Sequence, residues 1–461
     1  MTILAIDWSS VGLKAAQLIL SLSILVVLHE FGHYITARWF KCRVEKFYLF
    51  FDPWFSIVKK KIGDTVYGIG WLPLGGYVKI AGMVDESMDK EQLKQPPQPW
   101  EFRSKPAWQR LIIMLGGVTV NILLAFIIYA MILFVWGEKK TLNSSLNNGV
   151  WVTDSLMYDI GLRNGDKIIS VNDSEIKYFE DLPKKILFSG GSSIKIKRNE
   201  KDTILNIPIN VIGKLVEKKK AKVPLFIERL PSIVGEFYKN DSSNAKKGGL
   251  QYLDKIIRID NTPVRFFDEI STCLSNHKNE KVNFTIQRNG SELTLPIAVN
   301  EDGKTGLPIL TDDQYDSLGV FKLEKKKYGF FESFPAGVKL TFTSLSEYID
   351  QFKLIFKPST GAYKGVGGFK AMGGIFNGNE WDWQSFWRIT AFFSIVLAFM
   401  NLLPIPALDG GHVLFTLIEM ITGRKPNEKF LEYAQMVGMI ILLALMLYAN
   451  GNDWFGWGRD K

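Results

Sequence analysis

Cysteine is scarce in this chain of 461 residues, which contains only Cys42 and Cys273. Two cysteines so far apart do not imply a disulfide framework. Acidic residues are also outnumbered, because 56 Lys and Arg stand against 47 Asp and Glu, a formal charge of +9. Since the basic residues cluster beside apolar segments, the excess indicates membrane flanks and no nucleic-acid partner.

A cleavable signal peptide is not expected either. The first apolar segment has only Lys14 as its basic n-region and no small-x-small cleavage site. We therefore expect this segment to be retained in the protein. The chain is too long for one ordinary soluble core, so two or more domains are expected.

Long apolar runs are present, by contrast, and they predict a membrane protein. About 20 residues of helix cross the hydrocarbon of a bilayer. Segments of this kind are Val11 to Phe40, Ala107 to Trp136, Phe386 to Leu403 and Leu431 to Tyr448. Aromatic residues near their ends, such as Trp39, Trp136 and Trp387, suit the interfacial belt.

The basic residues predict the orientation of these spans. Cytoplasmic loops carry an excess of Lys and Arg. The first two spans enclose Lys41, Arg43, Lys46, Lys59, Lys60, Lys61, Lys79, Arg103, Lys105 and Arg110, and the last two enclose Arg424, Lys425 and Lys429. Both loops are therefore expected in the cytoplasm, with both termini and the long middle region outside.

The middle region, about residues 138 to 330, contains short β-like runs broken by Gly, Asn and Asp. It also contains an internal repeat, because Gly161 to Val171 aligns with Gly249 to Ile259. Two copies of one module of about 90 residues are the simplest interpretation.

Two further segments are predicted to lie at the membrane without crossing it. Gly68 to Ile80 is apolar, short and punctuated by Gly and Pro, which favours a re-entrant β-hairpin; an ordinary cytoplasmic hairpin is the alternative. After Pro335, one helical face carries apolar residues, which predicts an amphipathic helix beside the third span or one packed on the soluble modules. That face comprises Val338, Phe342, Leu345, Ile349, Phe352 and Phe356.

The first span contains the motif of a zinc peptidase helix, His29-Glu30-Phe31-Gly32-His33. Two imidazoles four residues apart share one helical face and supply two metal ligands. Zinc would lower the pKa of a bound water to about 7. Glu30 is the natural general base for that water. A structural polar cluster is the alternative, but ionisable groups in a lipid segment are expensive and therefore functional candidates.

A third ligand must come from the second half of the chain. The intramembrane candidates there are Asp409 and His412, and the residues alone allow either. Pro404 and Pro406 remove backbone donors and break the helix before them, and such irregular backbone usually lines a cavity. A simple kink between two helices is the alternative.

Together these motifs resemble the site-2 protease family of intramembrane zinc metallopeptidases. The first-span HExxH and the late segment from Asn401 to Gly410 carry the resemblance. The pattern at 161 to 171 resembles a PDZ domain, and a tandem pair between the second and third spans is similar to the RseP-like branch of Gram-negative bacteria. Leu72 to Lys79 resembles the membrane-embedded β-loop of that branch.

The resemblance implies roles for residues of the site. Asp409 would be the third zinc ligand, with one Zn²⁺ per chain and His412 as a neighbour. Asn401 would hydrogen-bond the substrate backbone, with Pro404 and Pro406 shaping that segment. The β-loop would add a strand edge to an unwound substrate, since a helix protects its own amides. The loop residues concerned are Gly75, Gly76 and Tyr77.

The expected fold is a multi-pass α-helical membrane protein with a membrane-associated β-hairpin and two extracytoplasmic PDZ domains. The predicted division is 1–137 for the first catalytic half, 138–226 and 227–325 for the PDZ domains, 326–382 for the amphipathic helix and linker, and 383–461 for the second catalytic half. The expected location is the bacterial inner membrane, with the active site toward the cytoplasm.

The predicted function is that of an intramembrane zinc endopeptidase cutting transmembrane segments of single-span proteins. The resemblance suggests a trimmed anti-sigma factor and remnant signal peptides as substrates, and a PDZ pair that filters substrates by size; peptide capture is the alternative. A non-enzymatic PDZ scaffold with a relic metal site is the competing class. An ion-coupled transporter is disfavoured, because the four spans show no repeat symmetry.

Some positions depart from the pattern or predict little. Leu253 replaces the glycine that Gly165 supplies in the first repeat, which puts its loop in doubt. The loop at residues 365–369 is unassigned. His277 is expected on the surface and Cys42 in packing. Asn121, inside the second span, is expected to aid helix packing, with gating or substrate contact as the alternative.

Overall fold

The computed structural model describes residues 7–83, 96–188, 191–217 and 224–457, and the chain divides into two compact units. Unit 1 comprises Met1–Gly137, Lys327–Lys353 and Lys364–Lys461. Unit 2 comprises Glu138–Lys326 and Leu354–Tyr363. The predicted domain boundaries within these units remain a prediction.

The four predicted spans are helices of unit 1. In the described part of the chain, four helices are long and apolar enough to cross a membrane: Trp8–Trp39, Ala107–Val135, Trp383–Leu402 and Lys429–Phe455. They correspond to α1 (Trp8–Trp39), α3 (Ala107–Val135), α12 (Trp383–Leu402) and α14 (Glu428–Phe455). The chain therefore has the helices of an integral membrane protein.

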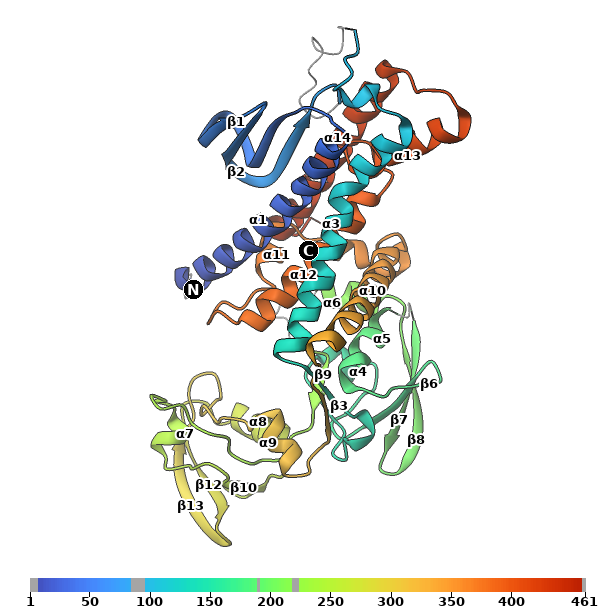
Figure 1. The fold of residues 1–461 in the computed structure, drawn as a ribbon. Coiled ribbons are helices and arrows are strands. Elements are labelled where there is room, and N and C mark those ends of the chain that lie inside the picture. The colour runs from blue at the N-terminus through green and yellow to red at the C-terminus, as the bar shows by residue number, and fades with distance from the viewer. Residues whose placement is uncertain (1–6, 84–95, 189–190, 218–223, 458–461) are drawn as a thin grey trace. The chain divides into compact units, whose positions relative to one another are not determined.

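Helix α3 lies at the centre of unit 1, alongside α1 and α12 (Figure 1). Its contact with α1 depends on glycine, because a Cβ at Gly116 would lie 2.5 Å from the carbonyl oxygen of Gly32. Close approach of two backbones through small residues is typical of helices packed in a membrane. The sequence therefore brings the histidine face of α1 directly against α3.

Strands β1 (Val44–Ile62) and β2 (Thr65–Ile80) form a larger sheet than the sequence predicts. The prediction of a hairpin formed within Gly68 to Ile80 is wrong, because both halves of β2 pair with β1. Residues 46–49 of β1 pair with 66–69 on one side and with 76–79 on the other. Glycine allows this, since a Cβ at Gly68 would strike the ring of Tyr48, and Gly75 turns with φ +152°.

Helix α10 (Phe330–Ile355) confirms the helix predicted around Pro335. A Cβ at Gly337 would lie 2.7 Å from the backbone nitrogen of Ala130 on α3. The ring of Tyr348 also packs edge-on against Phe399 of α12. The helix thus packs beside the second and third spans, as the first of the two alternatives expected.

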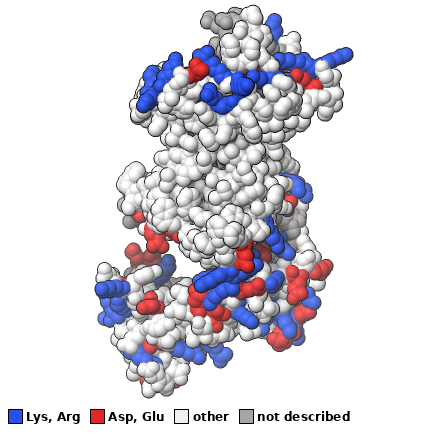
Figure 2. All heavy atoms as spheres, viewed as in Figure 1, with Lys and Arg blue, Asp and Glu red and all other residues white. Residues whose placement is uncertain are grey.

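The surface of unit 1 is unevenly charged. Figure 2 shows a broad surface without charged side chains along its helices, and Lys and Arg gathered at the end that carries β1 and β2. The two basic loops meet, because Lys425 Nζ donates to the carbonyl oxygen of Arg103 at 3.1 Å. Both loops therefore lie on the same side of the helices. The remaining elements of this unit are η1 (Phe102–Ser104), α11 (Phe369–Gly373) and α13 (Asp409–Thr422), and η5 (Ala362–Gly365) belongs partly to each unit.

Unit 2 contains two four-stranded sheets of matching order, β6-β5-β7-β8 and β11-β10-β12-β13. The first comprises β5 (Lys167–Val171), β6 (Ser174–Glu175), β7 (Ser192–Arg198) and β8 (Lys201–Ile207). The second comprises β10 (Lys255–Ile259), β11 (Thr262–Pro263), β12 (Lys281–Arg288) and β13 (Ser291–Ala298). Its helices are α4 (Ser155–Asp159), α5 (Leu182–Phe188), α6 (Val211–Glu217), α7 (Asn244–Lys247), α8 (Phe267–Ser275) and α9 (Asp312–Ser317), with η2 (Asn143–Ser145), η3 (Phe179–Asp181) and η4 (Pro358–Thr360).

Each repeat contains the same ion pair between a buried aspartate and a partly exposed arginine. The Arg198 guanidinium donates to both carboxylate oxygens of Asp166 at 2.7 Å, and Arg288 pairs with Asp254 at 2.7 and 2.6 Å. Leu253 keeps the turn that Gly165 makes, with φ +67° against +89°. The loop in doubt therefore has the same backbone form in both copies, at the cost of placing a leucine in the left-handed region.

Two short ribbons complete unit 2. Strand β4 (Val150–Val152) pairs with β9 (Phe226–Glu228). Strand β3 (Glu138–Thr141) pairs with β14 (Leu323–Lys326), with Glu138 opposite Lys326. Since these two residues are the ends of the segment Glu138–Lys326, the main segment of unit 2 begins and ends at one ribbon.

Candidate metal centre

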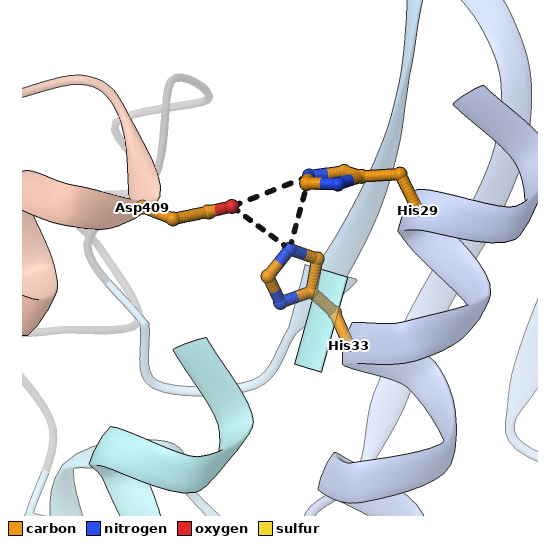
Figure 3. A group of neighbouring side chains, drawn as sticks. All are labelled: His29, His33 and Asp409. Atoms are coloured by element: carbon orange, nitrogen blue, oxygen red, sulfur yellow. Dashed lines mark hydrogen bonds and ion pairs between the residues drawn. The ribbon is translucent and has the colours of Figure 1, made fainter. Parts of the chain in front are cut away.

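His29, His33 and Asp409 converge on one point, although Asp409 is far from the histidines in sequence (Figure 3). The two histidines project from α1, one turn apart, and both are buried. Asp409 is the first residue of α13. Its Oδ2 lies 3.2 Å from Nε2 of each histidine, and the two nitrogens are 3.3 Å apart.

These three atoms fit a zinc ion. Ligand atoms bound tetrahedrally to one zinc at about 2.0–2.2 Å lie roughly 3.3–3.5 Å apart, close to the separations found here. Asp409 Oδ2 is buried and has no hydrogen-bond partner within the described ranges. Converging lone pairs without a proton donor are unfavourable unless a cation binds between them. The donor set of two imidazoles and a carboxylate is one that zinc uses in catalytic sites.

The broken segment after α12 places Asp409. Helix α12 ends at Leu402, Pro404 and Pro406 follow, and Ala407 adopts φ +78°. A Cβ at Gly411 would lie 2.7 Å from Pro406 Cα, so the start of α13 folds tightly against this segment. Asp409 then occupies the first turn of α13, where the helix dipole favours a negative charge.

Glu30 faces the edge of the β1–β2 sheet. A Cβ at Gly76 would lie 3.5 Å from Glu30 Cγ, so the strand passes beside this side chain. The backbone of Val78 also lies close enough to interact with the Glu30 carboxylate. The carboxylate is therefore held between the two histidines of its own helix and a strand, a position from which it can accept a proton.

The other predicted substrate residues are only partly brought together. Asn401 Nδ2 lies 3.2 Å from His29 Nε2, at the metal group. Gly76 adjoins Glu30, whereas the Tyr77 hydroxyl donates to Asp52 at 2.8 Å within the sheet. His412 is outside the metal group and lines a cavity of about 60 Å³ with Arg110 and Glu419, which form an ion pair.

Helix α3 supplies contacts that the sequence does not predict. The Ile113 carbonyl oxygen lies 2.9 Å from His33 Nδ1, and Asn121 Nδ2 lies 3.1 Å from His29 Nδ1. Gly117 lies between them, with no room for a side chain. The spacing of 113, 117 and 121 along one helical face is the signal that could have identified them, once α3 was paired with α1.

Comparisons with known proteins agree with this site. Residues 17–445 match the model of Peptidase family M50. A zinc metalloprotease of Rickettsia conorii is 30% identical over 444 residues, covering 94% of this chain and 96% of the relative. A relative of the same description from Campylobacter jejuni is 29% identical, and the match covers 98% of this chain and 95% of the relative. Another from Vibrio cholerae is 26% identical, and the match covers 94% of this chain and 97% of the relative.

The helices and the metal group define a membrane-embedded metalloprotease. The chain belongs to peptidase family M50, the site-2 proteases, and is a zinc metalloprotease. This membership favours the enzyme over the alternative of a scaffold with a relic metal site.

Proposed function

We propose that this zinc metalloprotease is an intramembrane endopeptidase that cuts the transmembrane segments of single-span proteins. One observation carries the proposal: both histidines of the metal group lie on α1, a helix long and apolar enough to span a bilayer. A peptide that reaches this group must therefore enter the membrane-spanning part of the enzyme.

The residues of the site have different roles in hydrolysis. His29, His33 and Asp409 would hold the zinc, and the bound ion would supply a Lewis acid that activates water. Glu30 accepts a proton from the attacking water and delivers it to the leaving amine. The strand beside Glu30 supports this role, because it places a candidate substrate path next to the general base.

The substrate would bind as a strand. A transmembrane helix hides its amides in internal hydrogen bonds, so it must unwind before water can attack. The edge at Gly75, Gly76 and Tyr77 offers backbone groups to an extended peptide. Asn401, beside His29, would hydrogen-bond the peptide near the scissile bond, with Pro404 and Pro406 keeping the backbone open around it.

Cleavage can be tested with purified protein in detergent and a model transmembrane substrate. We expect wild type to cut, and both Glu30→Gln and chelator-treated protein to lose cleavage; added zinc should restore only the latter. Equal activity in all three samples would reject the proposal. For the ligand set, Asp409→Asn should lose stoichiometric zinc while His412→Ala retains it, and the reverse result would reject Asp409.

The two repeats of unit 2 would be PDZ domains that exclude substrates with bulky outer domains. Their matching sheet orders and the resemblance of the repeat support this. Substrates would then be an anti-sigma factor already trimmed by another protease, and remnant signal peptides. Deleting both repeats should allow cleavage of untrimmed substrate. If untrimmed substrate still resists, the filter is wrong and peptide capture becomes the better explanation.

The enzyme would lie in a bacterial inner membrane with both termini and unit 2 in the periplasm. The meeting of the basic loops at Lys425 and Arg103 supports a shared cytoplasmic side. In a Cys273→Ser background, an impermeant maleimide should label Lys239→Cys in intact cells and label Lys60→Cys only after lysis. The opposite pattern would reverse the orientation.

A further inference from the structure

We propose that Asn121 is a positioning residue for the zinc ligand His29. Its side chain is fully buried and lies 3.1 Å from Nδ1 of His29, the ring nitrogen that faces away from the metal group. The other ring nitrogen, Nε2, faces Asp409 and His33. The contact of Asn121 therefore decides where the imidazole carries its proton.

The zinc-binding tautomer requires an acceptor at this position. A neutral imidazole carries one proton, so Nε2 has a free lone pair only when Nδ1 is the N–H. The amide oxygen of Asn121 must then face Nδ1 and accept that proton. The nitrogen and oxygen of an amide are related by a half-turn of the side chain. In the structure, Asn121 Oδ1 points away from His29 and is buried without a hydrogen-bond partner among the described residues. No hydrogen bond to Oδ1 therefore opposes the half-turn that brings this oxygen to Nδ1.

His33 shows the same arrangement with an unambiguous acceptor. Its Nδ1 lies 2.9 Å from the Ile113 carbonyl oxygen, which can only accept. Its Nε2 is therefore the lone-pair nitrogen, and it faces the metal group. Ile113 and Asn121 are two turns apart on α3, opposite histidines that are one turn apart on α1. One face of α3 thus sets the tautomer of both imidazole ligands.

Helix packing is the competing role for Asn121, and a neighbouring hydrogen bond provides the control. Ser394 Oγ, on α12, donates to the backbone oxygen of Asn121 at 2.7 Å and is equally buried. This bond joins α3 to α12 without reaching either histidine. Ser394→Ala therefore perturbs the same helix contact and leaves the tautomer of His29 unchanged.

The test measures zinc affinity of the full-length protein in detergent by competition with a chelator. Asn121→Leu, similar in size but without an acceptor, should weaken zinc binding by about 10–100-fold, the usual effect of losing such a partner. Asn121→Asp keeps an acceptor and should stay close to wild type, as should Ser394→Ala. In protein loaded with Co²⁺, only the Leu variant should alter the visible absorption bands.

Wild-type affinity in Asn121→Leu, or a loss in Asn121→Asp as large as in Asn121→Leu, would overturn the proposal. If the Leu variant does not fold, Asn121→Ala takes its place, with the same two outcomes. The inference rests on the ligand set of the proposed function, which is checked separately: zinc binding unaffected by His29→Ala would reject that set. Because the readout is metal binding, a failure to cleave any chosen substrate does not bear on it.

Discussion

Replacing Gly117 by alanine should remove zinc from the enzyme. A Cβ at this position would lie 2.5 Å from His33 Nε2 and 2.6 Å from His29 Cε1. Ordinary contacts between such atoms are about 3.5 Å or longer, so a ring must move by roughly 0.9 Å. Metal–ligand distances tolerate only about 0.2 Å. The displacement exceeds that tolerance several-fold, and the backbone of α3 is too closely packed to move away.

The measurement is zinc content per chain after purification, together with thermal unfolding of the zinc-free protein. We expect Gly117→Ala to hold far less than one zinc, and to cost about 1–3 kcal/mol in stability from overpacking. The matched control is Gly12→Ala on α1, where a Cβ would meet nothing within 4 Å. That change should keep full zinc and gain about 0.5–1 kcal/mol. Equimolar zinc in Gly117→Ala would refute the reasoning.

Further predictions concern unit 2. Burial raises the pKa of Glu228, and the nearby Asp312 and Glu180 carboxylates add to the shift. The folded state therefore binds the Glu228 proton more tightly than the unfolded state, so stability is lost as the pH rises above the pKa of the unfolded state. In denaturant unfolding, the stability of Glu228→Gln relative to wild type should increase from about pH 4 to 8. A stability difference that stays constant with pH would contradict this prediction. Arg288→Met leaves the buried Asp254 carboxylate without its ion-pair partner, with the Gln251 backbone N–H still donating to it, and should lower the unfolding free energy by about 3 kcal/mol; an unchanged midpoint would show that the ion pair contributes little. Leu253→Gly should relieve the strain of a left-handed backbone and raise the unfolding free energy by up to about 1 kcal/mol, as measured by thermal unfolding. Gly165→Leu should lower the unfolding free energy in the same measurement.

Much of the architecture could be predicted because its signals are local. Apolar runs of sufficient length predict all four spanning helices, and the 3.6-residue period after Pro335 predicts α10. The sheet formed by β1 and β2 could not be predicted from Gly68 to Ile80 alone, because the residues that pair with this segment lie outside it, at positions 44–59.

The metal group was likewise predictable only where its signals are local. His29 and His33 are recognisable because a helix alone sets their spacing. The residues did not choose between Asp409 and His412, because the choice depends on how α13 is rotated toward α1 after the break at Pro404 and Pro406. The resemblance to a family selected Asp409, and the structure brings it to the histidines. The sequence does not reveal the contacts of α3 with the two histidines, because the packing of α1 against α3 belongs to the tertiary structure.

The ribbon of β3 and β14 has a consequence for how such a protein could arise. Since Glu138 and Lys326 are paired neighbours, the main segment of unit 2, Glu138–Lys326, has both of its ends at a single place. A folded segment whose ends adjoin can be inserted into a loop of another protein without separating the residues on either side. The segment that carries the repeats is therefore suited to exchange as a whole, and a protease of this kind could acquire, lose or duplicate it while the helices that carry the metal group stay unchanged.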